Sequence, residues 1–347
     1  MAIDGNIAFL ASGIYGLSVV DIGTSPPVAK GGCKIPFIGE HVAVNGARDM
    51  AVVTGQSPDG TAHLWVLNTA NLTNPTISGE LPTTLPSVGD YSFKDVALTG
   101  DGTLAVVAAG RNGIWVVDVS IPSFPERIGT YDTPGVARGV TLNSSGTIAY
   151  VADGSSGLQI LSLINPHSPS LLGSKTVTGK YFRDIALDEA AQMVYLVDEN
   201  GTLVSVDVKT SAAPVVTSYN SFSAGAGRYI AIDETRDMMA VIESNATADS
   251  LEIFSTASPH SPAKPGAVGY VAVGSPSTAF GVALTGGYAY VAAASDGLKK
   301  YNCGGSLSFI PPPVNVPGYT YAVAVNSSYA YVTGFPSSIS IIKLFAQ

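Results

Sequence analysis

One short strand pattern returns along the whole chain, and this repetition restricts the fold more than any other feature. A stretch of the form Val/Ile-Ala-Val/Leu/Ile begins units near residues 1, 42, 96, 140, 185, 230, 282 and 323. The spacing of roughly 41 to 54 residues is that of one blade of a β-propeller. No apolar period of 3.6 residues persists beyond a turn or two, so the sequence predicts almost no helix.

Each unit contains further strand-like runs that turns separate from one another. A second run such as MAVVTG, a third such as IWVVDV and a fourth after a proline turn, such as FPERIGTY, follow the first. The first two runs are apolar on both faces, so a single sheet of this kind must bury both faces against neighbouring sheets. Later strands carry more polar residues, and we expect them to be half exposed.

The fold predicted from this pattern is all-β. It is an eight-bladed β-propeller of four-stranded antiparallel blades, with residues 1–347 as a single domain. The last unit has three strands, so an alternative is seven blades with an appended hairpin.

The net charge and composition of the chain limit the kinds of molecule that it can bind. The net charge of −9 argues against nucleic acid and against docking on anionic lipid, since both need a basic surface. No apolar run is long enough for direct membrane insertion. Only 12% of residues are charged, and the chain is rich in Gly, Ser and Thr, although it has no signal peptide at its start. We therefore expect an extracellular or cell-surface location, as a monomeric domain of a larger protein.

Four cations occupy equivalent positions, two residues before the first strand of successive units. They are Lys94, Arg138, Arg183 and Arg228. If the units form a ring, these side chains gather on one arc of its channel mouth. One interpretation is structural, with each cation bonded to loop carbonyls and to a neighbouring Asp. The other is an anion site, because guanidinium groups bind carboxylates and sulfates bidentately.

Three other residues join these cations as candidate ligand-binding residues at the same face: His41, Tyr15 and Tyr321. His41 is also the histidine best placed for a general base, although no catalytic residue is predicted. No cofactor is expected. Asp153 and Asp198 lie in turns where calcium binding is possible, but Asp-rich turns also occur for conformational reasons, so no metal site is predicted.

Cysteine and tryptophan are rare in this chain. Cys33 and Cys303 lack metal-site spacing, and two isolated thiols are favoured over one disulfide bridge. Trp65 and Trp115 lie in third strands, where we expect them to pack between blades. The alternative for them is stacking on carbohydrate.

The repeats resemble the LVIVD repeat family. The resemblance rests on the third-strand cores LSVVDI, IWVVDV and LVSVDV, on the turns SIPSFP and LINPHSP, on the linker 129–138 and on AYVADG at 149–154. It covers most of the chain, but the second and sixth units depart from it with insertions at 56–63, 244–250 and 269–281. The resemblance implies a surface or extracellular propeller and transfers no catalytic residues.

The function predicted on these grounds is recognition without catalysis. A rigid scaffold would bind a protein or carbohydrate partner through the channel-mouth face and the long loops. One alternative is a hydrolase or lyase, lactonase-like, with its pocket at the channel mouth. The other is a structural spacer in a large adhesin.

Overall fold

The computed structural model describes residues 2–343 with internal gaps. The gaps are 5–6, 12–16, 22–27, 34–37, 57–60, 72–73, 87–88, 223–224, 263–269, 275–278, 286, 294–297, 304–306, 315–318, 326–328 and 336–337. Apart from Cys33, side chains are described from residue 41 onward, and in the last strands only the backbone is described. Tyr15 therefore lies outside the described residues.

The chain divides into two compact units of antiparallel sheets. The first unit comprises residues 1–24, 28–179 and 211–213, and the second comprises residues 25–27, 180–210 and 214–347. In each sheet the strands follow chain order, so neighbouring strands are joined as hairpins.

The first unit contains four sheets of four strands each among its described residues. They are β1(Ala2–Asp4), β2(Ile7–Ala11), β3(Leu17–Asp21) and β4(Val28–Cys33); β5(Ile38–Asn45), β6(Met50–Gln56), β7(Thr61–Asn68) and β8(Thr76–Pro86); β9(Asp95–Leu98), β10(Leu104–Ala108), β11(Ile114–Asp118) and β12(Glu126–Tyr131); β13(Gly139–Leu142), β14(Ile148–Ala152), β15(Leu158–Ser162) and β16(Ser170–Lys175).

The second unit contains three four-stranded sheets and a three-stranded sheet within the described part. They are β17(Phe182–Asp188), β18(Met193–Asp198), β19(Thr202–Asp207) and β20(Val215–Ser221); β21(Ala226–Asp233), β22(Met238–Ser244), β23(Asp249–Ser255) and β24(Tyr270–Gly274); β25(Ala279–Thr285), β26(Tyr288–Ala293), β27(Leu298–Asn302) and β28(Ser308–Val314); β29(Tyr319–Val325), β30(Tyr329–Phe335) and β31(Ser338–Lys343). Three 3₁₀-helices, η1(Gly46–Arg48), η2(Gly89–Tyr91) and η3(Glu234–Arg236), complete the described elements.

The all-β prediction is confirmed, and no helix in the described residues is long and apolar enough to cross a membrane. The number of blades and the closure into one domain stay predictions. Both cysteines are free thiols, as the sequence favoured, and burial raises the pKa of Cys303 to about 12.

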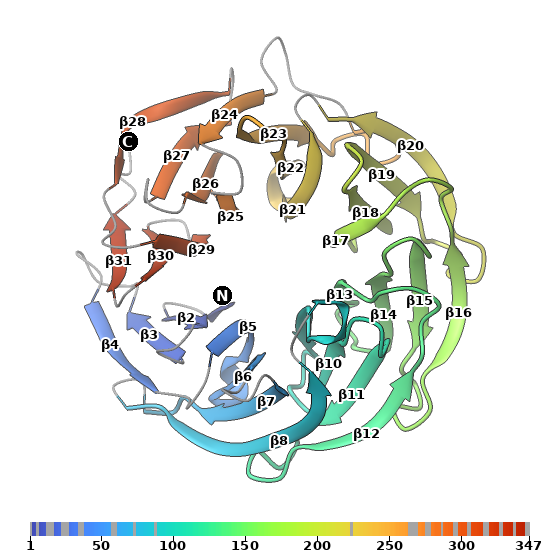
Figure 1. Cartoon of the computed structure of the whole chain (residues 1–347), viewed down its shortest axis with the longest axis vertical. Coiled ribbons are helices and arrows are strands. Elements are labelled where there is room, and N and C mark those ends of the chain that lie inside the picture. The colour runs from blue at the N-terminus through green and yellow to red at the C-terminus, as the bar shows by residue number, and fades with distance from the viewer. Residues whose placement is uncertain are drawn as a thin grey trace. The chain divides into compact units, whose positions relative to one another are not determined.

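Neighbouring sheets pack face to face within each unit. One apolar cluster joins Val52 and Leu64 of one sheet to Val107 and Trp115 of the next. Other clusters repeat this arrangement for the following sheet of the first unit and for the sheets of the second unit. Within each unit, first strands of consecutive sheets contact each other, as β5 does with β9 and β17 does with β21. Figure 1 shows the strands of one sheet side by side in chain order, for example β5 to β8.

Burial along a sheet differs from the sequence expectation at the third strand. The second and third strands, for example β18 and β19, are buried almost throughout, whereas the fourth strands β12 and β16 are mostly exposed. The third strand was expected to be half exposed. It is buried because it lies inside its sheet, between the second and fourth strands, and an apolar cluster from a neighbouring sheet packs against it.

A glycine in the fourth strand lets the next sheet approach closely. A Cβ on Gly129 would lie 2.0 Å from the carbonyl oxygen of Pro166, in the proline turn before β16. Gly79 and Gly173 have the same relation to the turns at Pro122 and Ser211, at 2.4 and 2.1 Å. The outer strand of one sheet therefore carries the proline turn of the next, and any side chain at these glycines would push the sheets apart.

We expect Gly129→Ala to lower the free energy of unfolding by about 1–3 kcal/mol, because the new methyl group collides with backbone that cannot rotate away. Urea denaturation followed by circular dichroism measures the change. Gly100→Ala is the matched control, since its Cβ would have 3.2 Å to the nearest atom and its loss should be smaller. Equal losses in the two variants would contradict the close approach.

Candidate functional site

The candidate residues of the sequence divide between the two units. His41 in β5, Lys94 before β9 and Arg138 before β13 belong to the first unit, while Arg183 in β17 and Arg228 in β21 belong to the second. Tyr321 lies in β29, where only the backbone is described. Of these candidates, His41, Lys94 and Arg138 therefore belong to one unit and can be described together.

Three cations of the first unit surround the short helix η2, and we call Asp90, Lys94, Arg111 and Arg138 the Asp90 cluster. Arg138 Nη2 donates to Asp90 Oδ1 at 2.6 Å, and Arg111 Nη2 lies 3.6 Å from Asp90 Oδ2. Lys94 Nζ donates to the carbonyl oxygen of Gly89 and, at 2.6 Å, to Ser92 Oγ. The cluster thus holds three positive charges and one carboxylate.

The backbone around this cluster is tightly built. Gly110 has φ of +59°, and a Cβ there would lie 1.9 Å from the carbonyl oxygen of Asp90. The Arg111 amide donates to that same oxygen at 2.7 Å. Gly110 and Ala137 exchange two backbone hydrogen bonds of 3.1 and 2.9 Å, which attach the linker before β13 to the β10–β11 turn. Backbone contacts therefore fix the segments that carry these cations.

The positive charge of Lys94 acts on the His41 imidazole. Burial, together with the charge of Lys94, lowers the pKa of His41 to about 4. At neutral pH the imidazole is therefore uncharged and a weak base, which makes it poorly suited to the general-base role that the hydrolase alternative requires.

The second unit carries related contacts around β17. Arg183 Nη2 donates to Glu199 Oε2 at 2.7 Å, and both side chains are substantially exposed. The Glu199 amide donates to the carbonyl oxygen of Tyr181 at 3.0 Å. Lys94 is bonded within its own linker, whereas Arg138 bonds to Asp90 of the linker before β9 and Arg183 bonds to Glu199 of the β18–β19 turn. These partners agree with the structural interpretation of the cations. Ligand binding by them stays a prediction.

Aspartates at the start of first strands link neighbouring sheets. Asp95 Oδ1 accepts from the Val96 amide at 2.9 Å, while Oδ2 accepts from Val140 N in the next sheet at 3.1 Å. Asp184 Oδ2 accepts from Ile230 N at 3.1 Å in the same way. Burial raises the pKa of Asp184 to about 6 in spite of its backbone hydrogen bonds. After Lys94 and Arg183, the aspartate that follows the cation therefore also links its sheet to the next one.

The turn aspartates considered for calcium bond to the linkers instead. Asp153 accepts from the Thr133 hydroxyl at 2.7 Å and from the Gly135 amide at 2.9 Å, and burial raises its pKa to about 6. Asp198 accepts from the Tyr181 amide at 2.6 Å. In the described part of the chain no three His, Cys, Asp or Glu side chains gather as a metal site. Calcium binding stays an untested alternative.

Sequence reasoning missed a histidine relay on β7. Thr61 Oγ1 lies 2.9 Å from His63 Nε2, and His63 Nδ1 lies 2.6 Å from Glu80 Oε1 on β8. The order hydroxyl, imidazole, carboxylate is that of an activated nucleophile. His63, however, stacks on Trp65 with ring centroids 5.5 Å apart and is only 12% exposed, so the contacts serve to fix the ring.

The low pKa of His41 predicts a pH dependence of stability. An ordinary His has a pKa near 6.5. Between pH 6.5 and about 4, His41 is therefore protonated in the unfolded chain but neutral in the folded chain. Stability from neutral His41 is complete above pH 6.5 and is lost as the pH falls, by about 3 kcal/mol at pH 4.

We therefore expect the free energy of unfolding of His41→Gln to fall less than that of the wild type between pH 7 and pH 4. Denaturant titrations at several pH values measure the two slopes. His167→Gln, at an exposed turn, is the control and should keep the wild-type slope. A His41→Gln slope equal to that of the wild type would contradict the buried neutral histidine.

Comparison with known proteins agrees with the repeat pattern. The LVIVD repeat family matches residues 92–133, 134–177 and 277–299. The first two matches span the sheets β9–β12 and β13–β16, together with the linkers that hold Lys94 and Arg138. No curated protein sequence matches the chain significantly.

Solved structures that resemble the chain are propellers of low sequence identity. The β-propeller domain of Cps50 (Swd1) from Myceliophteria thermophila has a TM-score of 0.60 at 12% identity, covering 88% of this chain and 97% of that one. The C-terminal WD40 domain of Sif2 has a TM-score of 0.71 at 12% identity, with 100% and 96% covered.

A third similar structure is described as a putative enzyme. A putative 6-phosphogluconolactonase from Bacteroides uniformis ATCC 8492 has a TM-score of 0.69 at 13% identity, covering 97% of this chain and 99% of that one. At such identities the likeness shows the fold and not the activity. The chain is an all-β protein of the β-propeller fold, and its residues 92–133, 134–177 and 277–299 match the LVIVD repeat.

Proposed function

We propose that this chain is a non-catalytic recognition module of a secreted or cell-surface protein, and that it binds a carboxylate-bearing protein or glycan partner at the Asp90 cluster. The observation that carries the proposal is the charge of that cluster. Arg111 and Arg138 both pair with Asp90, and Lys94 bonds to Gly89 and Ser92 of the same segment, in a chain whose overall net charge is −9.

The cluster offers both an exposed and a buried cation. The Arg111 side chain is 54% exposed, and its guanidinium is 3.6 Å from Asp90, so it can turn to a solute at small cost. Arg138 is 18% exposed and held at 2.6 Å. Arg111 would make the first bidentate contact with an incoming carboxylate, and Arg138 would supply the fixed positive field behind it.

Preorganisation supports recognition at this place. The linker that carries Asp90 is attached by the Arg111 amide and by the close approach of Gly110, and Asp95 ties β9 to β13. A partner would therefore bind without ordering these loops first, which spares the entropy that flexible loops lose on binding.

The two alternative functions, an enzyme and a structural spacer, require other features than a recognition module does. A lactonase-like hydrolase or lyase needs an acid or base that titrates near neutral pH, whereas His41 has a pKa of about 4 and Arg138 is engaged by Asp90. A structural spacer in a large adhesin predicts no preferred ligand at all. The resemblance to both a WD40 domain and a putative lactonase does not favour either alternative.

The test uses two carboxylate probes, a hexaglutamate peptide and a hyaluronan hexasaccharide, in isothermal titration calorimetry. We expect one probe to bind and its affinity to fall about 10- to 100-fold in Arg111→Gln and in Arg138→Gln, as expected for the loss of a charged hydrogen bond. Binding should also weaken as salt rises.

Arg236→Gln is the matched control. Arg236 lies 3.5 Å from Asp233 and is 48% exposed, so it is a surface Arg–Asp pair outside the cluster, and its variant should bind as the wild type does. Hexaglutamine and chitohexaose are the neutral counterparts of the probes. Equal binding of neutral and acidic probes, or equal affinity in all three variants, would exclude the carboxylate site.

A further inference from the structure

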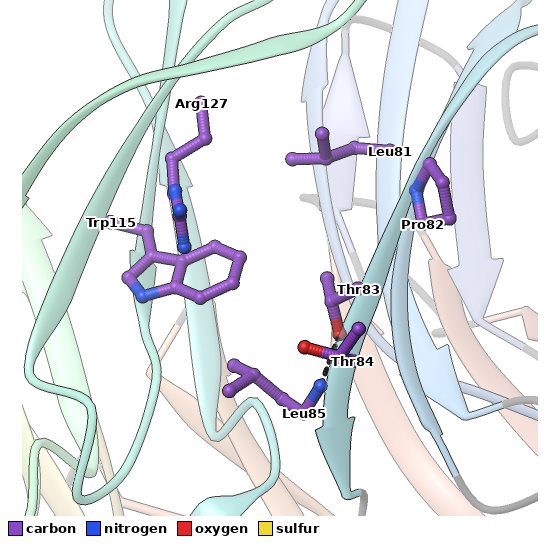
Figure 2. Close-up of a pocket in the computed structure, with 7 residues that line it drawn as sticks. All are labelled: Leu81, Pro82, Thr83, Thr84, Leu85, Trp115 and Arg127. Carbon is purple, nitrogen blue, oxygen red and sulfur yellow. Dashed lines mark hydrogen bonds between the residues drawn. The ribbon is translucent and has the colours of Figure 1, made fainter.

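A groove in the first unit lies outside the Asp90 cluster and departs from the repeat. It has a volume of about 500 Å³, and its lining comes from β8, β11 and β12. Figure 2 shows Leu81, Thr84 and Leu85 of β8 on one side, facing Trp115 and Arg127 across the gap. The volume falls in the range of small-molecule pockets, which are mostly apolar with a few placed polar groups.

The wall formed by β8 exists because this strand is longer than its counterparts. β8 has 11 residues, whereas the corresponding strands β12 and β16 have 6 each. Thr83 fixes the extension: its hydroxyl donates to the carbonyl oxygen of Ala62 at 2.6 Å and accepts from the Leu85 amide at 3.0 Å. Leu81 and Leu85 of the extension pack against the apolar cluster that contains Trp115, and the extension also adds a wall that the shorter strands lack. Such additions are where repeat proteins add function.

The opposite wall presents a guanidinium in a fixed position. The Arg127 Cζ atom lies 4.2 Å from the centroid of the Trp115 ring, and Phe93 holds that ring from its edge at 5.4 Å. Arg127 is exposed, and among the residues that the structure describes no carboxylate forms an ion pair with it. Stacking on the indole orients the planar donor groups before any ligand arrives.

We propose that this groove binds a small organic carboxylate with a flat apolar body. The carboxylate pairs with the Arg127 guanidinium, and the body lies along the groove against the side chains of Leu81 and Leu85. The Trp115 ring, which is 5% exposed and covered by Arg127, forms the base that holds the guanidinium. The Thr84 hydroxyl, which points into the gap in Figure 2, provides a further polar contact. Such a groove matches an amphipathic anion, because the guanidinium pairs with the negative charge and the leucines bury the apolar surface.

This site is independent of the Asp90 cluster and of the recognition function. Within the described part of the chain, neither Arg127 nor Trp115 forms an ion pair or a hydrogen bond with Asp90, and the groove is lined by neither Arg111 nor Arg138. The two proposals therefore fail separately, since each depends on its own arginines.

The experiment uses 2-naphthoate as the probe and 2-naphthamide as its neutral counterpart, titrated into the whole chain by calorimetry. We expect saturable binding of naphthoate and at least about tenfold weaker binding of the amide, because a charged hydrogen bond is lost. In Arg127→Gln the affinity for naphthoate should fall about 10- to 100-fold, and the preference for the acid should disappear.

Arg127→Lys separates charge from geometry. It keeps the positive charge over Trp115 but loses the bidentate fork, so its affinity should lie between those of the wild type and Arg127→Gln. Arg111→Gln and Arg236→Gln are controls and should bind naphthoate normally. Leu85→Ala should weaken the acid and the amide alike. The thermal unfolding midpoint of each variant checks that it is folded.

A second readout locates the ligand. The chain has two tryptophans, so a ¹H–¹⁵N spectrum has two indole signals, which Trp65→Phe assigns. Trp115 lines the groove and Trp65 does not, so naphthoate should shift the Trp115 signal and leave that of Trp65 in place. No saturable binding at millimolar naphthoate, a shift confined to Trp65, or unchanged affinity in folded Arg127→Gln would each overturn the proposal.

Discussion

The structure depends on face-to-face packing of sheets that are apolar on both sides. Strands such as β10, β14 and β18 have no polar face to give to water, so no sheet is stable alone and each must pack against a neighbour. This packing places the first strands of neighbouring sheets in contact. The linkers before those strands are then held at set positions, and the residues that they carry become a surface with defined geometry.

Buried carboxylates hold the linkers to the sheets at a cost. Asp153 and Asp184 each accept hydrogen bonds from linker or strand amides, yet burial raises the pKa of both to about 6. A raised pKa means that the folded protein destabilises the charged form relative to water. The hydrogen bonds offset part of that cost, and their directionality selects one arrangement of neighbouring sheets.

Both proposed sites use the same backbone framework in different ways. The Asp90 cluster is built from linker positions that recur in each repeat, so its framework follows the repeat and its side chains are local choices. The groove at Trp115 depends on the extended β8, which the other fourth strands of the first unit lack. A repeat fold thus supplies rigid walls, and small departures from the repeat create pockets between them.

The sequence by itself determined the all-β class, the succession of strands and the burial of the second strands, because apolar runs bounded by turns are local signals. Some hydrogen bonds are equally local: Asp118 and Asp207 each accept from the amide two residues on, within their own turns. The cations before the first strands were located, but their partners were not, because Asp90 is 48 residues from Arg138 along the chain.

Only the tertiary structure decided which contacts cross between sheets. The link from Asp95 to Val140, the turn of Pro166 against Gly129 and the stacking of Arg127 on Trp115 depend on distances between segments that local periodicity does not encode. The low pKa of His41 is of the same kind, because burial and the charge of Lys94 act through space. A strand pattern specifies what a segment must bury, and packing specifies against which neighbour it is buried.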